Sequence, residues 1–169
     1  MQAKHQVYLG LGSNLEGPEE QILQTIEHLN RDLNVSNVKH SNMVFSPPMG
    51  GPEQPNYVNS VCSFQTNCSP NEVLDLIRDL EQKQGRKRDL HWGPRTIDID
   101  ILLFDDLIIC NHELQIPHPG IHEREFVLVP LLELNKSLID PISGYPYSKL
   151  LEILLTKQPS ILLESPCKS

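Results

Sequence analysis

The sequence lacks the features that would place the chain in a membrane or outside the cell. No apolar run approaches the ~20 residues that a membrane-spanning helix needs. The N-terminal residues lead into a strand-like run without the apolar region of a signal peptide. The four cysteines form no CxxC pair and have no histidine nearby at zinc spacing. We therefore expect a cytoplasmic protein with unpaired thiols.

The sequence also lacks an excess of positive charge. Its 14 Lys and Arg residues against 22 Asp and Glu residues give a net charge of −8 at pH 7. This charge argues against a nucleic-acid partner or an anionic membrane surface. It does not exclude a phosphate site, because salt screens exposed charges over about 8 Å and a cluster of cations dominates its own surroundings.

The length of 169 residues fits a single domain, 1–169, which we expect to be monomeric. Apolar periodicity predicts strands at 7–11, about 38–45, about 57–65 and 96–102. One helix begins near Pro18, and a second follows a capping box at 69–72 and ends at Gly85. The order β-α-β-β-α-β predicts an α+β, ferredoxin-like fold: a four-stranded antiparallel sheet with both helices on one face. Extra C-terminal helices and a flexible tail from about residue 157 would complete it.

Strand parity predicts which residues face the helices. Side chains two positions apart on a strand point to the same face. The helices must cover the apolar face, which carries Val58, Ile97, Ile99 and Ile101. The opposite face then carries Tyr57, Asn59, Asp98 and Asp100. We therefore place the functional site on that opposite face.

The acidic pair on that face suggests a metal site. Adjacent carboxylates such as Asp98 and Asp100 repel each other unless a hard cation lies between them. A solvated strand face is the alternative interpretation, and the spacing alone does not decide. The basic segment at 86–95 favours a magnesium-phosphate site, because guanidinium groups bind phosphate oxygens in a fixed fork. The same segment could also be an ordinary solvated loop.

Three other features have both an ordinary and a functional interpretation. Residues 10–14 lack the third glycine of a dinucleotide fingerprint and a following Walker lysine, so a tight turn is favoured. His118, between two prolines, is a loop histidine unless that loop packs beside the basic segment. Tyr57 and Phe126 fit a core, but Tyr57 could instead stack on a flat heterocycle whose edge is bound by Asn59.

A series of motifs runs in unbroken order from about residue 7 to residue 135. The most specific is Trp-Gly-Pro-Arg-Thr-Ile-Asp-Ile-Asp-Ile-Leu at 92–102. The others are Leu-Gly-Leu-Gly-Ser-Asn-Leu at 9–15, Ser-Pro-Pro at 46–48, Gln-Pro-Asn-Tyr-Val-Asn at 54–59, Gly-Arg-Lys-Arg at 85–88, Pro-His-Pro at 117–119 and Arg-Glu-Phe at 124–126. Together they closely resemble the 6-hydroxymethyl-7,8-dihydropterin pyrophosphokinases of folate biosynthesis.

The resemblance implies a reaction and a set of site residues. ATP would donate its β,γ-pyrophosphoryl group to the hydroxymethyl oxygen of the pterin, releasing AMP. Asp98 and Asp100 would hold two Mg²⁺ ions, and Arg86 and Arg95 would bind the transferring phosphates. The implied pterin-binding residues are Ser46, Pro47, Met49, Tyr57, Asn59 and Phe126. The implied ATP contacts are Glu81, Arg88, Trp92, Arg95, Ile101, His118 and Arg124.

Two alternatives from other functional classes stay open. An RNA-binding module shares this topology, although the strand at 57–64 has no basic residue and lacks the aromatic RNP pattern. A magnesium-dependent phosphohydrolase could use the same acidic pair. It would release orthophosphate without any pterin.

Overall fold

The computed structural model describes residues 4–15, 17–48, 54–84 and 97–163. Its strands are β1 (His5–Ser13), β2 (Val35–His40), β3 (Val44–Ser46), β4 (Tyr57–Thr66), β5 (Asp98–Phe104), β6 (Ile109–Cys110) and β7 (Gln115–Ile116). Its helices are α1 (Pro18–Arg31), α2 (Pro70–Lys83), α3 (Glu125–Leu134) and α4 (Tyr147–Lys157), with a 3₁₀ turn η1 (Ile121–Glu123). The chain is thus an α+β protein, and none of the helices in the described part is long and apolar enough to cross a membrane.

The main sheet is antiparallel, with the strand order β2-β4-β1-β5 and with β3 also paired to β4. It has five strands rather than the predicted four, because the strand predicted at about 38–45 is divided at residues 41–43. At the division, the Ser41 hydroxyl accepts a hydrogen bond from the Val61 N–H at 3.0 Å. The Ser41 N–H donates to the Val61 carbonyl at 2.8 Å. The break in the strand therefore leaves these buried polar groups paired.

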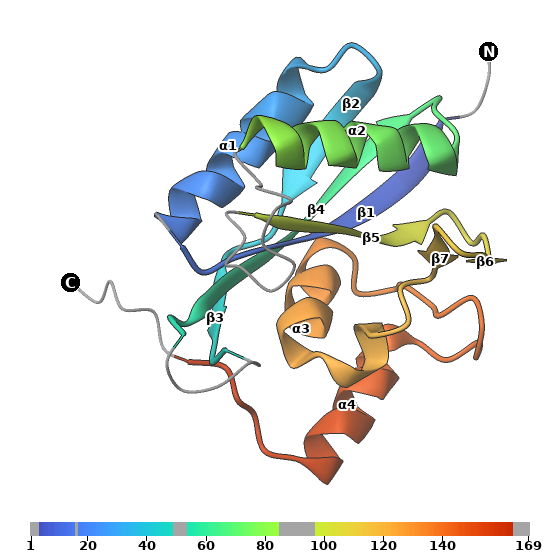
Figure 1. The fold of residues 1–169 in the computed structure, drawn as a ribbon. Helices are drawn as coiled ribbons and strands as arrows, with labels where there is room; N and C mark the ends of the chain where they lie inside the picture. The colour runs from blue at the N-terminus through green and yellow to red at the C-terminus, as the bar shows by residue number, and fades with distance from the viewer. Residues whose placement is uncertain (1–3, 16, 49–53, 85–96, 164–169) are drawn as a thin grey trace.

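Helices cover both faces of the sheet (Figure 1). On one face, α1 and α2 pack on Val58, Ile97, Ile99 and Ile101, which confirms the parity prediction for these residues. On the other face, α3 and α4 form a second core with side chains from β1, β4 and β5. This second core covers only part of that face. The uncovered part is left for the site.

The start of α2 follows the sequence prediction. The Ser69 hydroxyl accepts from the Glu72 N–H at 3.2 Å, and the Glu72 carboxylate accepts from the Ser69 N–H at 3.0 Å. These hydrogen bonds lower the pKa of Glu72. The capping box fixes where the helix begins, and with it the position of the helix on the sheet.

The cysteines of the described residues are free, as expected. Cys62 is fully buried in the core beneath α1 and α2, and burial raises the pKa of its thiol to about 12. Cys68 is half-buried and Cys110 is exposed. Cys167 lies outside the described residues.

The C-terminal segment departs from the sequence prediction. Residues 158–163, assigned to a flexible tail, return from the end of α4 toward β3 (Figure 1). The Ile161 N–H donates to the Glu125 carboxylate at 2.9 Å, and the Leu163 N–H donates to the Phe45 carbonyl at 2.8 Å. The tail prediction can therefore apply only to residues 164–169, which lie outside the described part of the chain.

Candidate active site

The floor of the site is built from three neighbouring strands. Gly12 of β1 lies opposite Asn59 of β4 on one side and opposite Asp98 of β5 on the other. Gly10 likewise lies opposite Asp100. Directly paired residues point to the same face of an antiparallel sheet, so these side chains flank a strip that carries no side chain of its own. A Cβ atom on Gly12 would lie 3.3 Å from the Asn59 Oδ1 atom.

The interpretation of residues 10–14 as a tight turn is therefore wrong for its first part. Gly10 and Gly12 lie inside β1, which continues to Ser13. Glycine in a strand interior often marks a bulge, a bend, or a place where a ligand or another chain segment approaches the backbone closely. Here the glycines open the floor of a pocket. The one feature of the sequence that could have indicated this role is that Gly10 and Gly12 lie two positions apart, and so on the same face of a strand.

A pocket of about 300 Å³ opens above this floor. It contains most of the residues that the sequence places on this face or assigns to the pterin: Ser46, Pro47, Tyr57, Asn59, Asp98, Asp100 and Phe126. Arg124, an implied ATP contact, lines the same pocket. Met49 lies outside the described residues. Lining residues to which the sequence assigned no role in the site include Gln54, Ser60, Leu102 and Val127.

Buried hydrogen bonds hold one wall of this pocket. The Asn59 amide donates to the Ser46 hydroxyl at 2.8 Å, and both residues are at most 5% exposed. At the end of β1, the buried Asn14 amide donates to the Pro55 carbonyl at 3.3 Å. Asn14 thus ties β1 to the segment that leads into Tyr57. Nothing in the sequence predicts either contact, apart from the presence of an asparagine at each position.

The acidic pair lies at the edge of the sheet, because β5 is an outer strand. Asp98 is half-buried, whereas the Asp100 side chain is 51% exposed. The His118 Nε2 atom lies 3.9 Å from an Asp100 carboxylate oxygen. The His118 Nδ1 atom accepts from the Gly120 N–H at 3.0 Å, so in the neutral ring the proton is on Nε2, toward Asp100.

The charge state of His118 follows from its surroundings. Burial lowers the pKa of His118 below its ordinary value of 6.5; Asp100 opposes this shift, and Arg124 reinforces it. His118 is therefore mainly neutral at pH 7. It can donate one hydrogen bond from Nε2 without adding a positive charge to the site.

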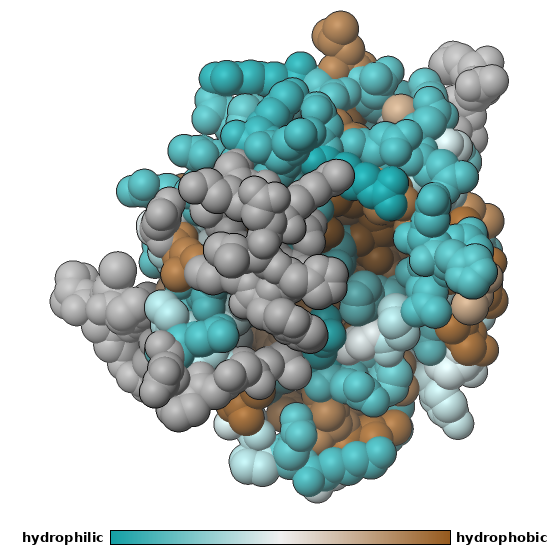
Figure 2. Space-filling model, in the orientation of Figure 1, coloured by the Kyte–Doolittle hydropathy of each residue, from teal (hydrophilic) through white to brown (hydrophobic). Residues whose placement is uncertain are grey.

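A second pocket of about 330 Å³ lies around the edge of β5. Figure 2 shows a recess with an apolar floor below α2. The lining includes apolar side chains from α2, from β5 and from the loop before β7: Leu74, Ile77, Ile99, Ile101 and Leu114. Asp100 and His118 line it as well. Asp100 is therefore common to both pockets.

The implied ATP contacts are distributed unevenly. Ile101 and His118 line the second pocket, and Arg124 lines the first. Glu81 is buried near the end of α2 and is not among the described residues that line either pocket. The remaining residues assigned to ATP or to its phosphates lie outside the described residues: Arg86, Arg88, Trp92 and Arg95.

The family model for 7,8-dihydro-6-hydroxymethylpterin-pyrophosphokinase matches residues 8–136. The chain belongs to this family. It is 43% identical over 136 residues to the 2-amino-4-hydroxy-6-hydroxymethyldihydropteridine pyrophosphokinase of Haemophilus influenzae, covering 80% of this chain and 85% of the relative. Identity to the Pseudomonas aeruginosa pyrophosphokinase is 42% over 132 residues, covering 78% and 82%.

A solved structure supports the fold of this pyrophosphokinase family. The Plasmodium falciparum HPPK-DHPS A437G chain with SDX-DHP aligns with a TM-score of 0.74 at 14% identity. The alignment covers 93% of this chain and 46% of that chain. The present chain thus spans less than half of that solved chain. At this identity the likeness concerns the fold alone.

Proposed function

We propose that the two pockets hold the two substrates of the family's reaction and that the acidic pair lies where those substrates meet. The chain is an ATP-dependent diphosphotransferase of folate biosynthesis, transferring pyrophosphate from ATP to 6-hydroxymethyl-7,8-dihydropterin. The observation that carries the proposal is that Asp100 lines both pockets. A group transferred between the occupants of the two pockets would pass this carboxylate.

The first pocket suits the pterin. Two aromatic rings, Tyr57 and Phe126, line it and offer flat surfaces to a heterocycle. Asn59 and Ser46 supply a carbonyl oxygen, an amide and a hydroxyl at the wall, which can bind the polar edge of the ring. Pockets of this kind combine apolar walls with a few fixed polar groups. The paired Asn59 and Ser46 are held in position before the substrate arrives.

The second pocket suits the nucleotide. Its apolar lining, including Leu74, Ile77 and Ile101, can cover an adenine base, while His118 and Asp100 lie toward the first pocket. The neutral His118 can donate to a phosphate oxygen from Nε2. On the family resemblance, we assign phosphate binding to Arg86 and Arg95. We assign further ATP contacts to Glu81, Arg88, Trp92 and Arg124.

The acidic pair fits Mg²⁺. Mg²⁺ is commonly bound by one or two carboxylates together with substrate phosphates and water. In the described ranges, no group of three or more His, Cys, Asp or Glu side chains is arranged to hold a metal by itself. The two aspartates would therefore hold the ions jointly with ATP. Bound there, the metal would neutralise phosphate charge and orient the attacking and leaving oxygens.

The residues of the chain then contribute mainly by positioning. Phosphoryl transfer depends on alignment and charge stabilisation more than on covalent catalysis. The first pocket would hold the pterin with its hydroxymethyl group toward Asp98 and Asp100, and the second would present the phosphates from the other side. This fixed alignment removes much of the entropic cost of bringing two substrates together.

We also classify the fold as ferredoxin-like. The order β2-β4-β1-β5, with α1 and α2 on one face, supports this classification when β2 and β3 together are counted as the single strand predicted at about 38–45.

We further propose a single domain over 1–169, monomeric and cytoplasmic, with no nucleic-acid or membrane partner.

The products of the reaction test this function. With ATP, Mg²⁺ and 6-hydroxymethyl-7,8-dihydropterin, we expect AMP and the pterin diphosphate in equal amounts on an ion-exchange column. Omitting the pterin should stop AMP formation. Release of ADP would instead indicate transfer of a single phosphoryl group. Release of orthophosphate without the pterin would favour the phosphohydrolase alternative.

A further inference from the structure

The segment after α4 connects two walls of the first pocket. We call residues 158–163 the C-terminal strap. It leaves the end of α4 and reaches β3 (Figure 1). It lies beyond residue 136, where the match to the family model ends. Its contacts are therefore a property of this chain that the family match does not describe.

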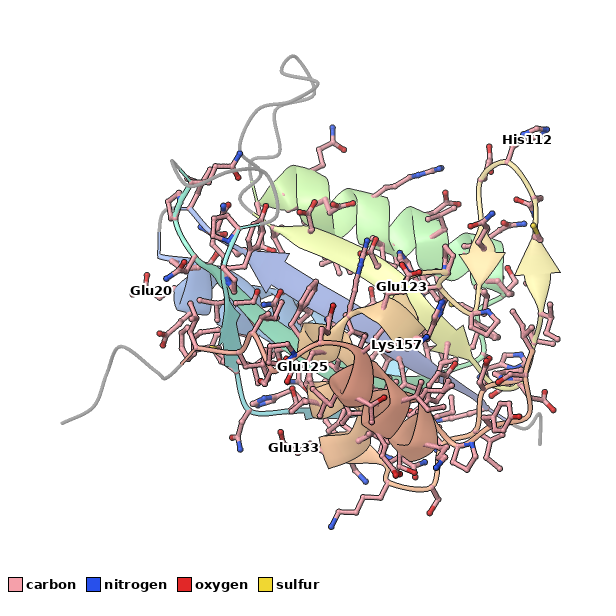
Figure 3. All side chains as sticks on the ribbon, turned by 90° about the horizontal axis from the view of Figure 1, so that it is seen from below. Glu20, His112, Glu123, Glu125, Glu133 and Lys157 are labelled. Atoms are coloured by element: carbon pink, nitrogen blue, oxygen red, sulfur yellow. The ribbon has the colours of Figure 1, made fainter. Side chains whose placement is uncertain are left out.

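One end of the strap is anchored on a buried carboxylate. Glu125, the first residue of α3, is 4% exposed. Its carboxylate accepts from the Ser160 hydroxyl at 2.6 Å and from the Ile161 N–H at 2.9 Å. Within the described residues no Lys, Arg or His forms an ion pair with it, so the strap supplies hydrogen bonds that offset the cost of burying this group. In Figure 3 Glu125 lies inside the outline of the α3-α4 layer, whereas His112 projects from the β6-β7 loop.

The other end of the strap covers the outer edge of β3. The Leu163 N–H donates to the Phe45 carbonyl at 2.8 Å, and the two residues form an antiparallel bridge. β3 has only three residues and pairs with β4 on its other side. A strand this short has few hydrogen bonds of its own to hold it. The strap therefore gives this short strand a second hydrogen-bonded neighbour, on the side opposite β4.

Both anchor points adjoin residues that line the first pocket. Glu125 lies between Arg124 and Phe126, and Phe45 precedes Ser46. Arg124, Phe126 and Ser46 all line that pocket. No described strap residue lines the second pocket, which is built from α2, β5 and the β6-β7 region. The strap thus connects the α3 wall and the β3 wall of one pocket only.

We propose that the C-terminal strap is a positioning element of the pterin pocket and that Glu125 is its anchoring residue. The strap holds Phe126 and Ser46 at a fixed separation, so that the pocket is shaped before the heterocycle binds. The proposal rests on the assignment of the first pocket to the pterin. Releasing the strap should weaken pterin binding and leave ATP binding nearly unchanged.

Two truncations of the chain test the proposal. Ending the chain after Pro159 removes both anchor contacts, and ending it after Leu163 keeps them, which makes the second variant a matched control. We expect the shorter chain to have a pterin KM raised about tenfold, as the loss of hydrogen bonds to a buried charge suggests. The ATP KM should stay within about twofold of its original value for both chains. A merely structural role would lower the amount of active enzyme without this difference between the two KM values.

A full-length variant tests the same contact without shortening the chain, so the proposal stays testable even if the truncated chain misfolds. Ser160→Ala removes one of the two hydrogen bonds to Glu125, and we expect a smaller rise in the pterin KM. Restoring a hydroxyl with Ser160→Thr should recover most of the effect. An unchanged pterin KM in the folded chain ending at Pro159, or an equal rise for both substrates, would overturn the proposal. If the unaltered chain forms no AMP, the proposed function fails instead, so the two failures are distinguishable.

Discussion

Replacing Asp98 or Asp100 by alanine is expected to slow pyrophosphoryl transfer by about a thousandfold or more, about 4 kcal/mol of transition-state stabilisation. Both carboxylates line the first pocket, and Asp100 also lines the second. They are the proposed oxygen ligands of Mg²⁺, and either variant would leave phosphate charge without its compensation. The measurement is kcat/KM for AMP formation at saturating Mg²⁺.

The control for these variants is another acid near the same strand. Asp106 lies exposed in the turn after β5, and it is not among the described residues that line either pocket. Asp106→Ala should therefore keep nearly full activity. Because the Asp100 side chain is 51% exposed, its replacement should change the melting temperature little. A loss of less than tenfold for both pocket variants would rule out a joint metal role.

Replacing Asn59 by alanine should raise the pterin KM about a hundredfold, corresponding to about 3 kcal/mol. The substitution removes the amide that can bind the edge of the heterocycle. It also removes the partner of the buried Ser46 hydroxyl, which accepts from Asn59 at 2.8 Å. A site whose buried polar groups lose their partners loses discrimination as well as affinity. The ATP KM should stay almost unchanged, because Asn59 lines only the first pocket.

Two further variants separate this effect from a general disturbance of β4. Asn59→Asp keeps the shape of the side chain but loses its N–H donors, so it should impair pterin binding nearly as much. Ser63→Ala changes a buried residue of the same strand that lines neither described pocket, and it should leave both KM values near their original values. A pterin KM within threefold of the original for Asn59→Ala would argue against the assignment of this pocket.

The residues that share a face of the sheet could be predicted from the sequence because strand parity is a local rule. The alternation of isoleucine and aspartate in β5 is enough to separate the core face from the site face. The capping box of α2 is similarly local, since Ser69 and Glu72 are three residues apart. In both cases the partners that matter lie within a few positions of each other.

The features that the sequence missed depend on contacts between distant segments. The division between β2 and β3 is stabilised by hydrogen bonds between Ser41, in the break, and Val61 of β4, 20 residues away. Gly10 and Gly12 resemble turn residues until β4 and β5 are placed beside them. The C-terminal strap has little apolar periodicity, and its anchor Glu125 is 35 residues from Ser160. No local pattern reports such pairings.

The arrangement of the two substrates around the acidic pair is tested most directly by a crystal structure of the ternary complex. The complex would contain Mg²⁺, 6-hydroxymethyl-7,8-dihydropterin and α,β-methylene-ATP, in which the bond to be broken is blocked. We predict the pterin between Tyr57 and Phe126, the adenine in the pocket around Ile101, and the metal ions bound by Asp98 and Asp100 between them. A pterin outside the first pocket, or metal ions that do not touch this pair, would contradict the account.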